Sequence, residues 1–415
     1  MQMEALFTTA LGLEEPWFVS QLDFNEAEKT LKIEIEFKKG SLFSYESEDN
    51  LKVHDSSYRE WQHLNFFEHK TVLRARVPRV KTSEGKAKTV KVPWSRPNSG
   101  FTLLMEAYLL TLCRVLPVSR VEELTKVSDN RIWYLIRSHV KELWEAQDWS
   151  ELKRLGIDET STKKGHNYGT AFVEITGKED AQGKGAAQVS RLLYFTPGKD
   201  KQTIANFAEE LDQRGVPRTQ IEEVAMDMSK AFKAGVTEQF PEATISFDRY
   251  HVMLLAGKAC DEVRKMVSKA EGALPKGALW ALRGNVTRLS QGAKDLRQQL
   301  CKDYSKIGRA LAIKDYLADT WIYENREDAE EHLRKVISWA SRSRLEPFKR
   351  LAKSLKNNLE GIMGYYQNYT TSAALEALNG KLQLAKRNAR GYRNFENFKA
   401  IAYLIAGNLP LSRPS

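Results

Sequence analysis

The sequence predicts a multi-domain α+β protein in which a small β-rich module and a helical domain precede a larger α/β core. Three observations support this prediction. At 415 residues the chain exceeds the usual length of one domain. Its first hundred residues contain alternating apolar and polar positions, whereas residues 101–149 have helical periodicity. Beyond residue 150, strand-like runs alternate with amphipathic helical runs, the order typical of an α/β sheet.

The composition favours a polyanionic partner. The chain carries 64 Lys and Arg residues against 54 Asp and Glu residues, a net charge of +10. This charge is typical of proteins that bind nucleic acid, although a basic protein without such a partner is not excluded. Cys113, Cys260 and Cys301 lie far apart, so neither a disulfide framework nor a cysteine zinc site is expected. Because no run of about 18 apolar residues and no basic leader occurs, we expect a cytoplasmic protein.

Residues 1–97 are expected to form the β-rich module. The segment TLKIEIEF, residues 30–37, alternates apolar and polar side chains and predicts a half-buried antiparallel strand. Residues 71–80 and 88–94 predict two more strands, in a stretch that holds nine Lys or Arg residues and one acid between positions 70 and 96. A solvated edge strand would explain this charge, but its one-sidedness favours contact with phosphates. The candidates for DNA contact are Arg74, Arg76, Arg79 and Lys81.

Residues 98–150 predict a helix-turn-helix domain. The segment VSRVEELTKVSDNRIWYLIRSHV, residues 118–140, predicts two helices joined by a short turn, with Ser119 and Ser128 as N-caps. The predicted shared core is Val121, Leu124, Ile132, Leu135 and Val140. The residues that the second helix would present to a major groove are Asn130, Arg131 and Tyr134. Any helical hairpin with a short turn has the same pattern, so the pattern alone does not establish DNA binding.

Residues 151–254 predict the first part of an α/β core. Three strand-like runs follow one another closely, and two further runs are each preceded by an amphipathic helix. This is the arrangement of a ribonuclease-H-like mixed sheet, although a doubly wound fold shares its second half. The first run ends near residue 158, and the others lie at about 169–175, 191–196, 224–228 and 244–248.

Two acids end strands of this predicted core, namely Asp158 and Asp227. If their strands are parallel neighbours, both carboxylates reach the edge of the sheet where ligands of open α/β sheets bind. Paired carboxylates suit Mg²⁺, for which Mn²⁺ can substitute. The alternative is that each Asp only caps a turn or helix, the commoner role for an acid placed like Asp227, two residues before Ser229. Spare candidates for a structural or substrate-positioning role are Glu159, Asp248 and His251.

Residues 255–365 predict an all-helical insertion, and residues 366–415 return to the core through a helix that supplies a third acid. Its predicted buried stripe is Leu375, Leu378, Leu382 and Ala385. Its adjacent polar face carries Glu376, Asn379, Gln383, Arg387 and Arg390. We expect Glu376 to complete a metal site, with a solvated helix face as the alternative. The candidates for DNA contact on this helix are Asn379, Gln383, Lys386, Arg387 and Arg390, of which the last three would hold phosphates. Two metal ions in such a site can catalyse an in-line phosphodiester displacement.

Three segments then carry a family likeness: GIDETSTKKGHNY, AMDMSKAFKAGVTEQFPEATISFDRYHV and LEALNGKLQLAKRNARGYRNFENF. Together they resemble the bacterial insertion-sequence transposases of the ISL-three group, which have a DDE catalytic triad, and the likeness covers nearly the whole chain. The resemblance implies a ribonuclease-H-like domain with a helical insertion and a triad of Asp158, Asp227 and Glu376. It also implies cleavage at terminal inverted repeats of double-stranded DNA and strand transfer into target DNA. Because two ends must be held together, we expect a homodimer, associated with the bacterial nucleoid when bound.

The chain departs from this resemblance at one place. The group looks as though it carries an N-terminal zinc ribbon, but the corresponding positions here are Ser44, Ser47, Thr82 and Gly85. These residues cannot form a zinc ligand set, so no zinc is expected, and whether the module reads DNA stays open. Two other functions are conceivable: a catalytically silent DNA-binding regulator, and a nuclease that cuts without joining. The intact triad argues against the first, and a strand-transfer product would exclude the second.

Overall fold

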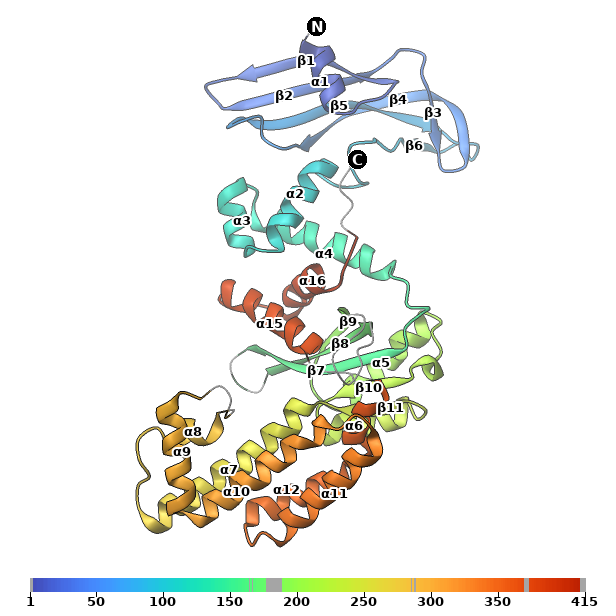
Figure 1. The fold of residues 1–415 in the computed structure, drawn as a ribbon. Coiled ribbons are helices and arrows are strands. Elements are labelled where there is room, and N and C mark those ends of the chain that lie inside the picture. The colour runs from blue at the N-terminus through green and yellow to red at the C-terminus, as the bar shows by residue number, and fades with distance from the viewer. Residues whose placement is uncertain are drawn as a thin grey trace. The chain divides into compact units, whose positions relative to one another are not determined.

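The computed structural model describes residues 3–163, 165, 167–176, 189–284, 286, 289–368 and 373–410. The chain divides into two compact units, one comprising residues 1–143 with 409–415 and the other residues 144–408. Within the described residues each unit contains one β-sheet (Figure 1). The described chain is a mixed α/β protein that is about half helical. No helix in this part of the chain has both the length and the apolar character needed to cross a membrane.

The first unit opens with helix α1 (Met3–Ala10) and a six-stranded sheet. The strands are β1 (Trp17–Asn25), β2 (Thr30–Phe37), β3 (Leu42–Tyr45), β4 (Glu48–Gln62), β5 (Lys70–Lys81) and β6 (Ala87–Thr89). Their order is β1-β2-β5-β4-β3, with β6 paired to β5. β2 is antiparallel to β1 but parallel to β5, so the predicted antiparallel pairing is correct on one side only. The alternation of β2 is confirmed, because its apolar side chains are buried in the core of the module.

The basic strand β5 lies inside this sheet, so the interpretation as a solvated edge strand is wrong. Its arginines form ion pairs with carboxylates of the neighbouring strands. The pairs are Arg74–Glu34 at 3.0 Å, Arg76–Glu36 at 2.6 Å and Arg79–Asp55 at 3.1 Å. The charges of these three arginines are therefore paired across the sheet.

A carboxylate joins the two turns at which the resemblance places zinc ligands. The first turn, which contains Ser47 and follows Ser44 of β3, connects β3 to β4. The second turn, with Thr82 and Gly85, connects β5 to β6. Glu48 accepts two hydrogen bonds from Ser83, at 2.9 Å from the backbone N–H and at 3.0 Å from the hydroxyl. Side-chain hydrogen bonds thus link these turns directly.

Three helices follow: α2 (Leu103–Cys113), α3 (Val118–Thr125) and α4 (Asp129–Glu145). The predicted turn between α3 and α4 is confirmed at Lys126, which has a left-handed φ of 55° and whose N–H binds the Glu122 carbonyl. Ser128 directly precedes α4 as predicted, but the predicted cap Ser119 is wrong, because Pro117 occupies the N-cap of α3.

The predicted core of these helices is correct except at Leu124. Val121, Ile132, Leu135 and Val140 are at most 3% exposed, whereas Leu124 is 64% exposed. The buried face of α3 is formed by Val118, Val121 and Thr125. Leu124 lies about 95° away from the centre of that face, at 100° per residue, so its side chain points to solvent.

The second unit contains a five-stranded mixed sheet. Its strands are β7 (Arg154–Lys163), β8 (Asn167–Thr176), β9 (Val189–Pro197), β10 (Glu223–Met226) and β11 (Thr244–Phe247). In the order β11-β10-β7-β8-β9, β8 is antiparallel to both neighbours and β10 is parallel to both of its own. The helical connections are α5 (Lys201–Gln213), the 3₁₀ helix η1 (Arg218–Gln220) and α6 (Lys230–Gln239). This is the succession of strands and helices that the sequence predicts.

The prediction that the first core strand ends near Asp158 is wrong, since β7 continues to Lys163. Its parallel pairing with β10 ends at Ile157 opposite Met226, but its antiparallel pairing with β8 continues to Lys163. The apolar run in the sequence therefore marks the segment of β7 that has a neighbour on both sides, and the strand itself extends further.

The described residues between β11 and residue 368 form helices and no strand. They are α7 (Arg249–Glu271), α8 (Ala278–Arg283), α9 (Gln291–Asp303), α10 (Ser305–Ala318), η3 (Asp319–Ile322), α11 (Arg326–Arg342), α12 (Glu346–Asn357), α13 (Leu359–Met363) and α14 (Tyr365–Asn368). The chain then forms α15 (Ala373–Asn388) and α16 (Phe395–Ala406).

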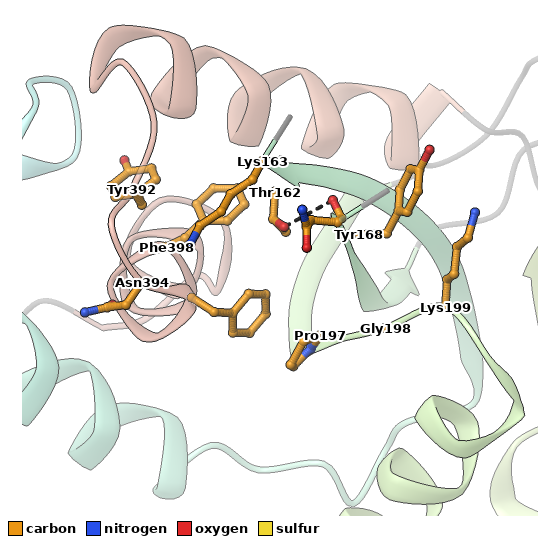
Figure 2. Close-up of a pocket in the computed structure, with 11 residues that line it drawn as sticks. Thr162, Lys163, Tyr168, Pro197, Gly198, Lys199, Tyr392, Asn394 and Phe398 are labelled. Atoms are coloured by element: carbon orange, nitrogen blue, oxygen red, sulfur yellow. Dashed lines mark hydrogen bonds between the residues drawn. The ribbon is translucent and has the colours of Figure 1, made fainter. Parts of the chain in front are cut away.

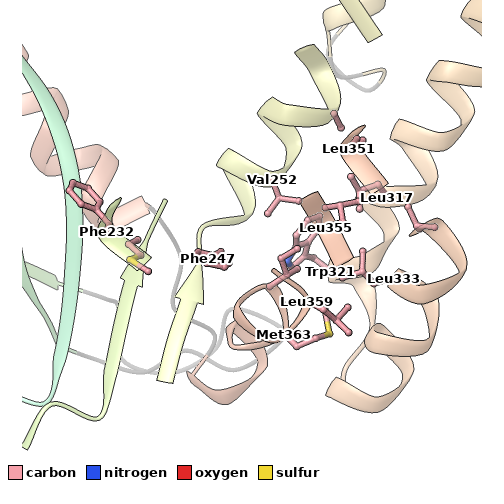
Figure 3. Packing of buried hydrophobic residues seen from close by; sticks show 14 of the residues in the cluster. Phe232, Phe247, Val252, Leu317, Trp321, Leu333, Leu351, Leu355, Leu359 and Met363 are labelled. Atoms are coloured by element: carbon pink, nitrogen blue, oxygen red, sulfur yellow. The ribbon is translucent and has the colours of Figure 1, made fainter. Parts of the chain in front are cut away.

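The helices α7 to α13 and the sheet of the second unit share one hydrophobic core. Val252, Leu317 and Leu355 meet between α7, α10 and α12 (Figure 3). A Cβ atom on Gly361 of α13 would lie only 2.3 Å from the Phe247 ring, so the missing side chain allows this helix to approach β11 closely. The helical region is thereby packed directly onto the strand next to β10.

Candidate active site

Three acids lie at the same level on adjacent parallel strands of the second unit. Ile157 of β7 is paired with Met226 of β10, which is in turn paired with Phe247 of β11. The residues that directly follow these three are Asp158, Asp227 and Asp248. Parallel neighbours bring such positions to one edge of the sheet. The predicted pairing of Asp158 with Asp227 at one edge agrees with this register, and Asp248, a spare candidate in the sequence, completes the row.

Hydrogen-bond donors hold the first two carboxylates. Asp158 Oδ1 accepts a hydrogen bond from Glu159 N at 2.7 Å, and Asp158 Oδ2 accepts one from Asn379 Nδ2. Asp227 Oδ1 accepts a hydrogen bond from Ser229 N at 2.9 Å. The N-cap of α6 is Ser229, so Asp227 orders the turn before the helix and does not itself cap it.

Asp248 caps α7 and holds a histidine. Its Oδ1 accepts a hydrogen bond from Tyr250 N at 2.9 Å, and its Oδ2 is bound by His251 Nδ1 at 2.9 Å. The Asp248 carboxylate is only 8% exposed, whereas the His251 side chain is 31% exposed, so the histidine is the partner that solvent reaches.

Helix α15 packs closely onto β7 and carries the third predicted acid. The predicted stripe is confirmed for Leu375, Leu378 and Leu382, which are at most 5% exposed. A Cβ atom on Gly156 would lie 2.4 Å from Leu375 Cδ2, so the absence of a side chain at Gly156 lets the helix approach the strand. This contact places the first turn of α15, with Glu376, beside Asp158.

The polar face of α15 is bound along β7. Gln383 Nε2 donates to Thr160 Oγ1 at 2.5 Å, and Lys386 Nζ donates to Ser161 O at 2.6 Å. Together with the bond from Asn379 to Asp158, these contacts fix the helix over about two turns. The side chain of Lys386, predicted to hold a phosphate, is thus engaged by the protein backbone.

The acids share one cavity of about 300 Å³. Its lining residues are Ile157, Asp158, Glu159, Met226, Asp227, Asp248, Tyr250, His251, Leu375, Glu376 and Asn379. All three predicted triad residues and all three spare candidates therefore lie around the same space, although they come from segments as far apart as residues 158 and 376.

Burial and mutual repulsion perturb the ionisation of this site. Burial raises the pKa of Asp158 to about 6, and the carboxylates of Asp227 and Asp248 act in the same direction. Burial also raises the pKa of Glu159. The hydrogen bond to Asp248 raises the pKa of His251, as do the surrounding acids. The cavity therefore concentrates negative charge that a cation would compensate.

The donor set fits a hard divalent cation. As the side chains stand, no group of three or more His, Cys, Asp or Glu within the described ranges is arranged to hold a metal ion. However, carboxylates from Asp158, Asp227 and Glu376 line one cavity, and such oxygens are the preferred ligands of Mg²⁺. In addition, Asn379 Oδ1 is buried without a hydrogen-bond partner while its amide nitrogen binds Asp158. A cation or its bound water would satisfy this oxygen.

The predicted DNA-contacting residues of α4 are all exposed, but they differ in the contacts that they make within the protein. Asn130 is exposed and Tyr134 is 61% exposed. Arg131, by contrast, lies 4.2 Å above the Phe101 ring and donates to Gln62 Oε1 at 3.0 Å and to the Gly100 carbonyl at 3.2 Å. Burial lowers the pKa of Arg131. This arginine therefore fastens α4 to the β-rich module.

The basic candidates near the end of α15 do not all lie on the helix. Arg387 is exposed in the last turn of α15. Lys81, at the end of β5, is also exposed. The expectation that Arg390 shares the helix face is wrong, because α15 ends at Asn388 and Arg390 has a left-handed φ of 56°. The N–H of Gly391 binds the Lys386 carbonyl at 2.8 Å and so terminates the helix.

A second cavity, of about 330 Å³, is lined by residues that sequence reasoning missed (Figure 2). Its charged and aromatic members are Lys163, Tyr168, Lys199, Tyr392, Phe395 and Phe398. These residues belong to segments separated by about 200 positions, so no local spacing could have indicated that they meet.

Comparison with known proteins identifies the family. A family model described as a transposase matches residues 155–402, and one described as the helix-turn-helix domain of transposase family ISL3 matches residues 90–140. The transposase for insertion sequence element IS1557 of Mycobacterium tuberculosis is 27% identical over 386 residues, which cover 85% of this chain and 82% of that protein. The transposase for insertion sequence element IS1001 of Bordetella parapertussis is 23% identical over 355 residues, 84% of each chain. Since the transposase model covers more than half of the chain, this protein belongs to the ISL3 family of insertion-sequence transposases and is a DNA transposase.

Proposed function

We propose that this transposase binds the terminal inverted repeats of its own element, cuts the DNA at the element ends and joins the freed 3′-hydroxyl to target DNA. Asp158, Asp227 and Glu376 are the proposed catalytic triad, and the observation that carries this proposal is the single cavity that they line. On this proposal, the sheet of β7 to β11 with α15 is a ribonuclease-H-like core, and helices α7 to α14 are its insertion.

Transposases of the DDE class generally use divalent metal ions, and for this enzyme we propose Mg²⁺, with Mn²⁺ as a substitute. Asp158, Asp227 and Glu376 would hold the ions. A cation bound there activates an attacking water or hydroxyl and offsets the charge that develops at the phosphate. The protein's own contribution is to keep the carboxylates in position, through Asn379 for Asp158 and through the Ser229 N–H for Asp227.

The Asp248–His251 pair is proposed to position the substrate at the edge of the same cavity. His251 lines the cavity and is held through Nδ1 by a shielded carboxylate. An imidazole fixed in this way can donate its other N–H to a phosphate oxygen or to a water molecule.

DNA recognition by the helix-turn-helix domain is proposed to use α4 in a major groove. Asn130 and Tyr134 are the proposed base-reading residues because they are exposed. Arg131 is exposed as well, but its guanidinium is engaged by Gln62 and Gly100, so we propose a smaller part for it in base reading. The proposed phosphate contacts are Lys81, Lys386, Arg387 and Arg390, together with the ion-paired Arg74, Arg76 and Arg79. A homodimer is proposed because two element ends must be joined in one complex.

The test is a reaction of the purified protein with labelled DNA that carries the repeats flanking its gene. With Mg²⁺ we expect nicking at the element ends and joining to target DNA, and with EDTA neither product. Asp227→Ala should bind the DNA but give no product. Cutting without joining would identify a nuclease, and tight binding without cutting in any metal would identify a regulator.

A further inference from the structure

The 330 Å³ cavity of the second unit combines aromatic and cationic walls (Figure 2). Tyr168 and Lys199 lie on one side, and Tyr392 and Phe398 lie on the other. The lining comes from the end of β7, the start of β8, the end of β9 with the two residues after it, the segment that joins α15 to α16, and the start of α16. The triad uses none of these residues.

Stacking and burial hold the aromatic wall in place. The rings of Tyr392 and Phe398 stack with centroids 5.1 Å apart and an interplanar angle of 16°, and Phe398 is only 2% exposed. Tyr392 Oη donates to the Ala385 carbonyl at 3.5 Å. Ring faces held in this way bind a flat base without a large loss of side-chain entropy.

The cationic wall is placed to meet a phosphate. Lys163 Nζ donates to the Arg393 carbonyl at 3.0 Å, which holds its ammonium group at the rim of the cavity. Lys199 Nζ lies 3.9 Å from the centre of the Tyr168 ring and is 47% exposed. An ammonium group beside an aromatic face is the combination that binds single-stranded nucleic acid.

The cavity adjoins the acidic one. Lys199, which lines the aromatic cavity, is 3.6 Å from the carboxylate of Glu159, which lines the acidic cavity. Along β7, Thr162 is four residues beyond Asp158, a distance of roughly 13 Å at about 3.3 Å per strand residue. A DNA strand with its cleaved phosphate at Asp158 therefore reaches the aromatic cavity within a few nucleotides.

We propose that this cavity binds one unpaired nucleotide of the DNA strand that is cut, close to the cleavage position. This inference rests on the proposed function and adds a substrate subsite to it. Tyr168 and Tyr392 stack on the base, and Lys163 and Lys199 pair with its flanking phosphates. The volume lies at the lower end of the roughly 300–1,000 Å³ found for small-molecule sites, which suits one nucleotide and excludes a duplex.

The test measures DNA binding in EDTA, so that no cutting occurs, by the full-length protein. We use pairs of element-end duplexes that differ at one position near the cleavage site. In one member of the pair this position is abasic, and in the other it holds a nucleotide that is mismatched and therefore unpaired. The series moves this position through the nucleotides nearest the cleavage site. At one position we expect the unpaired nucleotide to bind about 5- to 100-fold more tightly than the abasic one. Because each protein is compared with itself, this ratio does not depend on how much of the protein is folded.

The matched variants assign the ratio to the cavity. Tyr392→Ala and Tyr168→Ala should bring the ratio close to one, whereas Tyr392→Phe, which keeps the ring, should preserve it. Trp280→Ala, which removes a 70% exposed ring on α8 outside the cavity, should also preserve it. Lys163→Gln should weaken binding of the abasic and the unpaired-nucleotide duplex by the same factor. It should also reduce the slope of log affinity against log salt concentration by the amount expected for one lost phosphate contact.

Two results would overturn the inference: a ratio near one at every position for the wild-type protein, or a ratio that survives both tyrosine-to-alanine variants. Failure of the proposed function is a separate result. If the wild-type protein binds the repeats but does not cut them in Mg²⁺, the abasic ratio can still be measured. If it cuts and joins normally with a ratio of one, only the nucleotide subsite is rejected.

Discussion

At the scale of single residues, burial determines the ionisation of the Asp158 carboxyl group. Its pKa is raised from the ordinary 3.8 to about 6 in the folded protein. Between these two values the folded chain binds a proton that the unfolded chain releases, so stability decreases as the pH rises through this window. Above about pH 6 the full destabilisation is present, and a cation that binds the carboxylate removes it.

Asp158→Asn should therefore stabilise the metal-free protein at neutral pH. A shift of about two pKa units corresponds to about 2–3 kcal/mol, or several degrees in melting temperature. The Asn379 amide can turn over so that its unpaired Oδ1 accepts from the new side chain. The gain over wild type should grow from pH 4 to pH 6 and then level off in thermal unfolding in EDTA. A gain that is independent of pH would contradict the assignment to the ionised Asp158.

Asn379→Ala should slow DNA cleavage by about 10- to 100-fold at saturating DNA, because it frees the Asp158 carboxylate to rotate. DNA affinity should change little. Lys381→Ala, an exposed position on the same helix that does not line the cavity, is the control for effects on α15. Equal slowing by both variants would show that Asn379 acts only through helix stability.

At the scale of secondary-structure elements, the packing of α15 on β7 depends on Gly156, Leu375 and the polar contacts that follow. The sequence predicts the buried stripe of α15 and the acid beside it, because 3.6-residue periodicity is local. It does not predict where β7 ends or that the arginines of β5 face acids, because both depend on partner strands. Asp248 joins the row of acids for the same reason, through the register of β11 with β10.

Gly156→Ala should force α15 away from β7. The new methyl group would meet Leu375 at 2.4 Å, an overlap that costs about 1–3 kcal/mol in a packed core. We expect a lower melting temperature and slower DNA cleavage. The second substitution Leu375→Val should restore part of both, and additive losses in the double variant would contradict a direct contact.

Arg131→Ala and Tyr134→Ala should affect DNA binding differently. Loss of the Arg131 contacts with Phe101, Gln62 and Gly100 should destabilise the first unit and weaken binding to all DNA sequences by a similar factor. Tyr134→Ala should instead reduce the preference for terminal-repeat DNA over unrelated DNA, by up to about 1–3 kcal/mol. Competition binding at fixed salt separates the two, and a lost preference in Arg131→Ala would assign base reading to that arginine.

At the scale of the whole molecule, the order of the parts is readable from the sequence, since each motif is contiguous. The aromatic cavity is not, because it joins segments about 200 residues apart without a motif, whereas the sequence does predict the acids of the other cavity, from the ends of strands and from the family resemblance. Asp158 and Glu376 meet only because the helices from α7 to α14 return the chain to β7. The cavity around Tyr168 and Tyr392 could not be predicted, because aromatic residues carry no motif until the fold brings them together.

The proposed metal centre requires that acids from three distant segments of the chain bind the same ion. The most direct measurement replaces Mg²⁺ by Fe²⁺ and adds ascorbate and peroxide, so that radicals formed at the ion cut the nearby backbone. We expect cuts close to Asp158, Asp227 and Glu376 together, suppressed by excess Mg²⁺ and absent in Asp227→Ala. Cuts confined to other parts of the chain, or cuts at these positions that persist in Asp227→Ala, would contradict it.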